Sequence, residues 1–121
     1  MRQSGSPWTQ FSMAVRQSGN ATILDLTGPL GAGESVQIFR DRVDELLKQE
    51  TRNLAINLVN VPYVDSTGIG VLVGTQTSVE AAGGKCKFYA ATPRVLQVLK
   101  MTHVDEVLNL HTDEASALTS F

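Results

Sequence analysis

In this 121-residue sequence, the segment whose side chains are best suited to a chemical function is Asp65-Ser66-Thr67. All three are residue types that cap a helix by accepting a hydrogen bond from a free backbone N–H, and one of them is enough for that purpose. Ser66 also carries a hydroxyl that can accept a phosphoryl group, which adds roughly −1.5 to −2 charges and three strong acceptors. Because the dipole of a helix N-terminus favours negative charge, we expect the fold to survive this modification.

Two glycines, Gly68 and Gly70, follow within the first two turns of the expected helix. Each disfavours a helix by about 1 kcal/mol relative to alanine, so selection for helix stability alone would avoid them. Two explanations stay open: tight helix–sheet packing, or a partner or phosphate close to the helix N-terminus. A docked partner would meet a new dianion beside Asp65 once Ser66 was phosphorylated, which predicts a binding switch. The competing interpretation is that Asp65 and Ser66 only cap the helix.

Signals of catalysis and of metal binding are weak. No glycine-rich phosphate loop, Gly-x-Ser-x-Gly elbow or dinucleotide fingerprint is present. His103 and His111, the candidate bases, lie far downstream of Ser66. The single cysteine, Cys86, excludes an internal disulfide, leaves no zinc-ligand spacing and is expected to be a buried thiol. The sequence therefore predicts a protein that is not an enzyme and that holds no metal.

Charge and hydropathy restrict the partners. Ten basic and twelve acidic residues give a net charge of −2, which lacks the basic excess that direct nucleic-acid binding needs. No apolar run approaches the ~20 residues that span a bilayer, and the polar start lacks a signal-peptide core. With one cysteine, a reducing compartment is natural. We therefore expect a cytoplasmic protein without membrane contact.

The hydrophobic pattern predicts alternating strands and helices. Two short alternating runs around a Ser-Gly-Asn turn predict an antiparallel hairpin, and apolar spacings of three and four residues predict the first helix. An N-cap residue precedes each later helix. The expected strands are 11–15, 21–26, 54–59, 86–91 and 107–110, and the expected helices are 34–49, 66–82, one from 92–93 and one after 112–114.

This β-β-α-β-α-β-α-β-α order predicts one α/β domain over residues 11–121, with a mixed central sheet, an N-terminal antiparallel hairpin and helices packed against it. Residues 1–10 are expected to be a flexible extension, with docking of Trp8 on the domain left open. The carboxyl edge of parallel strands usually hosts function, and residues 63–68 and 91–94 fall there. The loop 28–33 is an expected neighbour, and Tyr63 with the Leu30 loop is a candidate apolar contact surface.

The nine residues from Val64 to Leu72, with the core Asp-Ser-Thr-Gly-Ile-Gly, closely resemble the phosphorylation motif of the STAS domain family. Within that family the match is to the stand-alone bacterial anti-sigma factor antagonists. The resemblance extends over roughly residues 11–118 and includes the expected STAS-like element order and the tail 92–99, 104–107 and 113–115. One departure is His103, where related sequences often carry glycine.

The resemblance implies a partner-switching function. The unmodified antagonist would bind an anti-sigma factor that is also a serine kinase, and so release a sigma factor. Phosphorylation of Ser66 would end this binding, and a metal-dependent serine phosphatase would restore it; Thr67 is the alternative acceptor. The kinase supplies ATP and Mg²⁺, so no cofactor of the chain's own is expected. The residues predicted to bind the partner are Asp65, Ser66, Thr67, Gly68, Gly31, Thr92 and Arg94.

Other functions stay open at this point. The chain is alternatively a non-switching scaffold subunit of a signalling complex, or a ligand-binding or transporter-type regulatory STAS domain. Arg94 either serves binding or is simply solvated. The sequence leaves a homodimer open and does not name the sigma factor.

Overall fold

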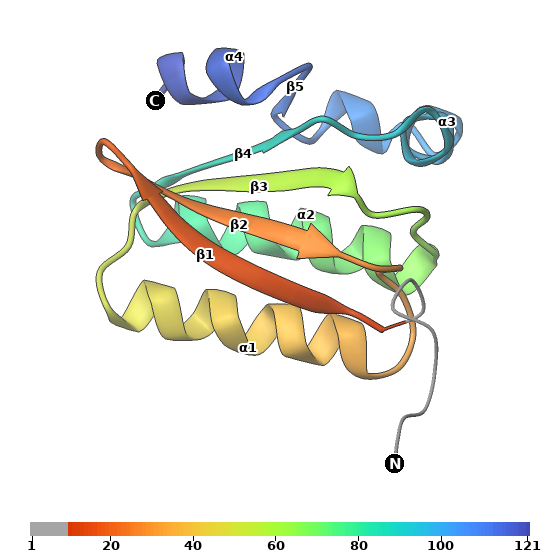
Figure 1. The fold of residues 1–121 in the computed structure, drawn as a ribbon, viewed down its shortest axis with the longest axis horizontal. Helices are drawn as coiled ribbons and strands as arrows, with labels where there is room; N and C mark the ends of the chain where they lie inside the picture. The colour runs from red at the N-terminus through yellow and green to blue at the C-terminus, as the bar shows by residue number, and fades with distance from the viewer. Residues whose placement is uncertain (1–9) are drawn as a thin grey trace.

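The computed structural model of the protein describes residues 10–121. The expected flexible extension 1–10 and the docking of Trp8 therefore lie outside the described residues, Gln10 excepted. Five strands and four α-helices follow one another in the predicted order, and the strands form one sheet in the order β1-β2-β3-β4-β5 (Figure 1).

The first two strands form the predicted hairpin. β1 (Ser12–Ser18) pairs antiparallel with β2 (Ala21–Thr27), and Ser18 lies opposite Ala21. Gly19 adopts a positive φ of 59° in the turn between them, a conformation that glycine reaches without steric cost.

The remaining strands are parallel, as the intervening helices require. β3 (Asn53–Asn60) pairs with β2, β4 (Lys85–Tyr89) with β3, and β5 (Leu110–His111) with β4. The carboxyl ends of β2, β3 and β4 therefore lie at one edge of the sheet, on the right in Figure 1.

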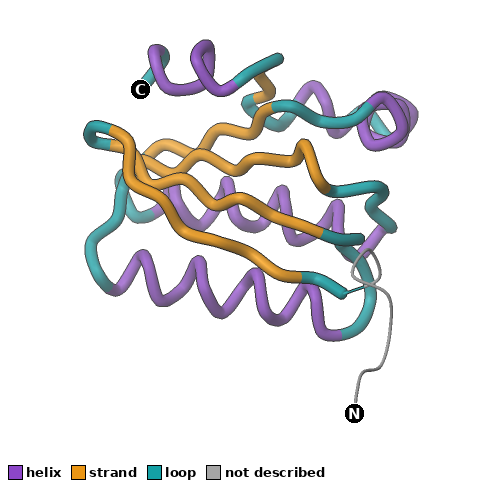
Figure 2. The backbone as a smooth tube through the Cα atoms, in the orientation of Figure 1, coloured by secondary structure: helices purple, strands orange, loops and turns teal. Residues whose placement is uncertain are grey.

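Helices cover the two faces of the sheet unequally. α1 (Glu34–Lys48) and α2 (Ser66–Ala81) lie side by side on one face, and α3 (Pro93–Met101) adds Val95 and Leu99 to the same core (Figure 2). Alternate strand residues such as Leu24 and Ile56 point into this core and are fully buried. The short α4 (Glu114–Thr119) covers a second, smaller cluster on the opposite face.

The last strand is misplaced in the sequence prediction: it was expected at 107–110, and β5 is Leu110–His111. A 3-10 turn, Val104–Glu106, precedes it. The side-chain amide of Gln76 on α2 bonds to the backbone on both sides of Leu108, with 2.8 Å to the Val107 carbonyl and 2.9 Å to the Asn109 N–H. These backbone groups are satisfied by a side chain, so they do not need a strand partner.

The departure at His103 falls on an unusual backbone position. His103 has φ 61° and ψ 15°, the left-handed region, directly before the 3-10 turn. A side chain there is disfavoured relative to glycine, which explains why a glycine suits this turn.

Candidate functional site

Two loops meet at the carboxyl edge of the sheet. Leu30, after β2, pairs in a single parallel bridge with Val64, after β3. The Leu30 N–H donates to the Tyr63 carbonyl at 3.2 Å, and the Asp65 N–H donates to the Leu30 carbonyl at 3.3 Å. This confirms that the loop 28–33 is a neighbour of the Asp65–Ser66 segment.

Asp65 holds both loops together. One carboxylate oxygen caps α2 by accepting from the Gly68 N–H at 2.9 Å, and the other accepts from the Ala32 N–H at 2.8 Å. The Ala32 N–H, followed by the Gly68 N–H, keeps the pKa of the Asp65 carboxyl below its usual range. A negative charge is therefore fixed directly beside Ser66 at neutral pH.

Two buried glycines, Gly31 in the β2–α1 loop and Gly68 in the motif, allow this close approach. A Cβ at Gly31 would collide with the Asp65 carboxylate, and a Cβ at Gly68 would collide with the Leu30 carbonyl oxygen. Tight packing within the domain, one of the two explanations considered for these glycines, therefore accounts for Gly68. Gly70 differs, because it is exposed and no atom of the described residues lies within 4 Å of the Cβ it lacks.

Ser66 and Thr67 are exposed on the first turn of α2. Neither hydroxyl is hydrogen-bonded to any other group in residues 10–121. By contrast, Thr75 and Thr77 on the same helix donate to the carbonyls four residues earlier, at 2.7 and 3.0 Å. The Ser66 hydroxyl is thus open to an enzyme or a partner that approaches this edge.

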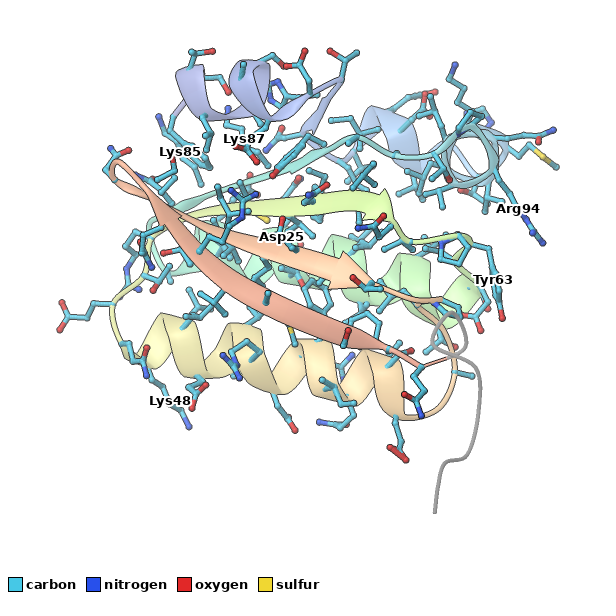
Figure 3. All side chains as sticks on the ribbon, viewed as in Figure 1. Asp25, Lys48, Tyr63, Lys85, Lys87 and Arg94 are labelled. Carbon is cyan, nitrogen blue, oxygen red and sulfur yellow. The ribbon has the colours of Figure 1, made fainter. Side chains whose placement is uncertain are left out.

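The start of α3 contributes to the same edge. Thr92 caps α3 by accepting from the Val95 N–H at 3.2 Å, as its predicted N-cap position requires. The guanidinium carbon of Arg94 lies 5.3 Å from the centroid of the Tyr63 ring, a cation–π contact (Figure 3). Tyr63 is 42% exposed, whereas the Leu30 side chain is fully buried, so other residues of the Leu30 loop would have to form the predicted contact surface with Tyr63.

Both histidines have partners away from Ser66. His103 Nδ1 lies 3.1 Å from the Glu106 carboxylate, and the His111 ring lies beside Ser116 and Ser120 on or after α4. Cys86 is buried as expected, and this burial raises the pKa of its thiol. Across residues 10–121, no group of three or more acidic, histidine or cysteine side chains could hold a metal. None of the helices there is long and apolar enough to cross a membrane.

An ionic network on the far face of the sheet was missed by sequence reasoning. Arg16 on β1 bonds to the Asp25 carboxylate on β2 and, at 2.7 Å, to the Glu114 carboxylate on α4. Tyr89 donates to Glu114 at 2.7 Å and Asn57 to Asp25 at 2.8 Å. Hydrogen bonds from Arg16 lower the pKa of both carboxyls. The pairing depends on residues up to 98 positions apart, so no local pattern reveals it.

Comparison with known proteins decides the family. The sequence model of the STAS domain matches residues 12–117. The chain belongs to the STAS domain family. This STAS domain is 29% identical over 100 residues to the anti-sigma-B factor antagonist of Bacillus subtilis, covering 83% of this chain and 90% of the relative. It is 24% identical over 97 residues to the anti-sigma F factor antagonist of Paenibacillus polymyxa, covering 80% and 83%.

Solved structures share the fold of this STAS domain. The unphosphorylated anti-sigma factor antagonist SpoIIAA superposes with a TM-score of 0.71 at 19% identity, covering 87% of this chain and 92% of SpoIIAA. The phosphorylated form of Bacillus SpoIIAA superposes with a TM-score of 0.68 at 17% identity, covering 91% and 100%. At this identity the likeness establishes the mixed five-stranded sheet with its helices, and confirms the predicted STAS-like fold.

Proposed function

We propose that this STAS domain is an anti-sigma factor antagonist that works by partner switching. In the unphosphorylated state it binds an anti-sigma factor that is also a serine kinase, and the captured partner releases its sigma factor. The observation that carries the proposal is the exposed Ser66 hydroxyl, which has no hydrogen bond within residues 10–121 and lies beside the ionised Asp65 at the start of α2. The names of the Bacillus and Paenibacillus relatives support the same function.

The binding surface is built around the first turns of α2. Ser66 and Thr67 offer hydroxyls, and the Arg94–Tyr63 pair offers a cation on an aromatic face. Gly70 adds an exposed helix position at which no atom of residues 10–121 lies within 4 Å of the missing Cβ. A partner can therefore approach the helix closely at Gly70. In this proposal, a docked partner is the reason for glycine at that position. Gly31 and Gly68 act indirectly in this proposal, because both are buried where the β2–α1 loop meets the start of α2.

Phosphorylation of Ser66 would end the binding by charge. The phosphate would sit at the N-terminus of α2, where the helix dipole accommodates a dianion without unfolding the domain. Asp65 is already ionised there, so a partner would have to desolvate adjacent like charges on docking. Taking ionised groups out of water without a compensating partner costs several kcal/mol per ion, enough to switch an interaction off. A serine phosphatase would restore binding, and ATP and Mg²⁺ would come with the kinase. The proposal places this exchange in the cytoplasm.

The experiment uses the full chain, candidate anti-sigma kinases from the same genome, ATP and Mg²⁺. We expect the intact mass to rise by one phosphoryl group, located on Ser66 by fragmentation. Ser66→Ala should stay unmodified and stay bound, while Thr67→Ala should be modified like the wild type. Retained modification in Ser66→Ala would move the acceptor to Thr67, and a stable complex that ignores phosphorylation would indicate a scaffold instead.

A further inference from the structure

A groove of about 560 Å³ lies beside the Ser66 surface, between the start of the described chain, the β2–α1 loop and the first turns of α1. Its lining combines the polar residues Gln10, Glu34 and Ser35, and a largely polar exposed surface, with five apolar or aromatic residues: Phe11, Pro29, Ala32, Ile38 and Tyr63. Ile38 is 41% and Tyr63 42% exposed, which places two of the exposed large apolar side chains of residues 10–121 in one groove. Exposed apolar side chains that share a concave surface indicate a docking site.

The chain itself leads into this groove. Gln10 lines it, and a Cβ at Gly28 would collide with the Gln10 carbonyl. Gly28 also has φ 102°, a conformation that favours glycine. Glycine at this position therefore lets the backbone of Gln10 lie against the β2–α1 loop, and Phe11 packs against the core just after it. Gln10, the first residue that the structure describes, therefore lies at the groove.

We propose that Trp8 occupies this groove. Trp8 precedes Gln10 by two positions, so its Cα lies within about 7 Å of that of Gln10. An indole ring buries roughly 150–250 Å² of mostly apolar surface and also needs an acceptor for its N–H. The groove supplies both, because Glu34 and Ser35 line it together with the apolar side chains. The inference commits to the chain's own N-terminal segment as the occupant.

The groove adjoins the Asp65–Ser66 segment. Ala32, in its lining, donates to the Asp65 carboxylate, and Tyr63 stacks with Arg94. If the proposed function holds, a docked Trp8 covers one flank of the kinase-binding surface and competes with the partner there. The docking itself does not depend on that function and is tested without any partner.

Trp8 is the only tryptophan in the sequence, so its fluorescence reports its own surroundings. The emission maximum and acrylamide quenching of the full chain are compared with those of a peptide of residues 1–10. Ile38→Asp places a charge in the groove at an exposed position, and Val107→Asp places the same charge on the exposed Val107 after the 3-10 turn as a matched control. Circular dichroism confirms that both variants fold.

We expect the wild type and Val107→Asp to emit at shorter wavelength than the peptide and to be quenched several-fold less. Ile38→Asp should return both readings to those of the peptide. NOEs between the Trp8 ring and the Ile38 methyl groups in the wild type would support the same placement without a variant. A peptide-like wild type, an Ile38→Asp variant that keeps the wild-type emission, or emission that changes with protein concentration as a second copy binds would each overturn the proposal.

Discussion

Alanine at Gly68 and at Gly70 should have opposite effects on stability, although the two positions are two residues apart on the same helix. At Gly68 the new methyl group meets the Leu30 carbonyl oxygen, a backbone atom in the bridge between the two site loops. At Gly70 the methyl group meets no atom of residues 10–121 within 4 Å. The pair therefore separates packing from helix propensity.

The magnitudes follow from these two contacts. Alanine gains about 1 kcal/mol over glycine in a helix interior, which Gly70→Ala should realise in full. Overpacking costs roughly 1–3 kcal/mol, at the upper end where backbone must move, so Gly68→Ala should lose about 1–2 kcal/mol net. The two variants should then differ by about 2–3 kcal/mol, or roughly 6–15 °C in Tm for a domain of this size.

Urea unfolding followed by circular dichroism gives both free energies, with wild type as the reference. In addition, Gly70→Ala should weaken binding of the anti-sigma partner despite its greater stability, because the new methyl group stands on the proposed contact surface. A Gly68→Ala variant at least as stable as wild type would refute the packing argument. A destabilised Gly70→Ala would show that glycine is required there by the fold and not by a partner.

Three further substitutions test the remaining structural claims. Asp65→Ala removes the α2 cap and the tie to the β2–α1 loop, so unfolding should become easier by about 1–2 kcal/mol and the Ala32 amide should exchange faster; unchanged exchange would contradict the tie. Arg16→Met should cost up to about 2 kcal/mol at pH 7, since it removes two ion pairs and exposed pairs contribute ~0.2–1 kcal/mol each. The folded pKa values of its carboxylate partners are lowered, so this contribution is present above the ordinary carboxyl pKa of ~4 and is lost as the pH falls through the folded values. Urea titrations from pH 7 to pH 2 should therefore converge for wild type and variant, and a constant gap would exclude the ionic origin. His103→Gly should stabilise by roughly 0.5–1 kcal/mol, because the left-handed conformation costs a side chain ~1–2 kcal/mol and glycine's extra chain entropy offsets part of the gain; a lower Tm would contradict this.

Much of the fold was predictable because its signals are local. Hairpin turn, N-caps and apolar periodicity depend on neighbours a few residues apart, and Asp65, Thr92 and Asp113 do cap their helices. The last strand was misplaced because the bonds that satisfy residues 107 and 109 come from Gln76, about thirty positions earlier. No local pattern carries that information.

In the candidate site, too, local features were predictable from the sequence and contacts between distant segments were not. The sequence pattern identifies Asp65 as a cap, but its second bond, to Ala32, depends on two loops meeting across the sheet edge. Likewise both motif glycines look alike in sequence, and only the fold separates Gly68, which contacts Leu30, from the open Gly70. The contact between Asp65 and the β2–α1 loop was partly predictable. A glycine-rich loop after β2 and a capping cluster after the neighbouring strand should lie at the same edge of the sheet.

The central claim is that a phosphate on Ser66 changes what the domain binds and not how it folds. The most direct measurement is calorimetric titration of the anti-sigma kinase with unphosphorylated and with stoichiometrically phosphorylated full-length protein. A loss of at least 3 kcal/mol of binding free energy, or roughly a hundredfold in Kd, is the predicted result. Equal affinity of the two forms would contradict the account.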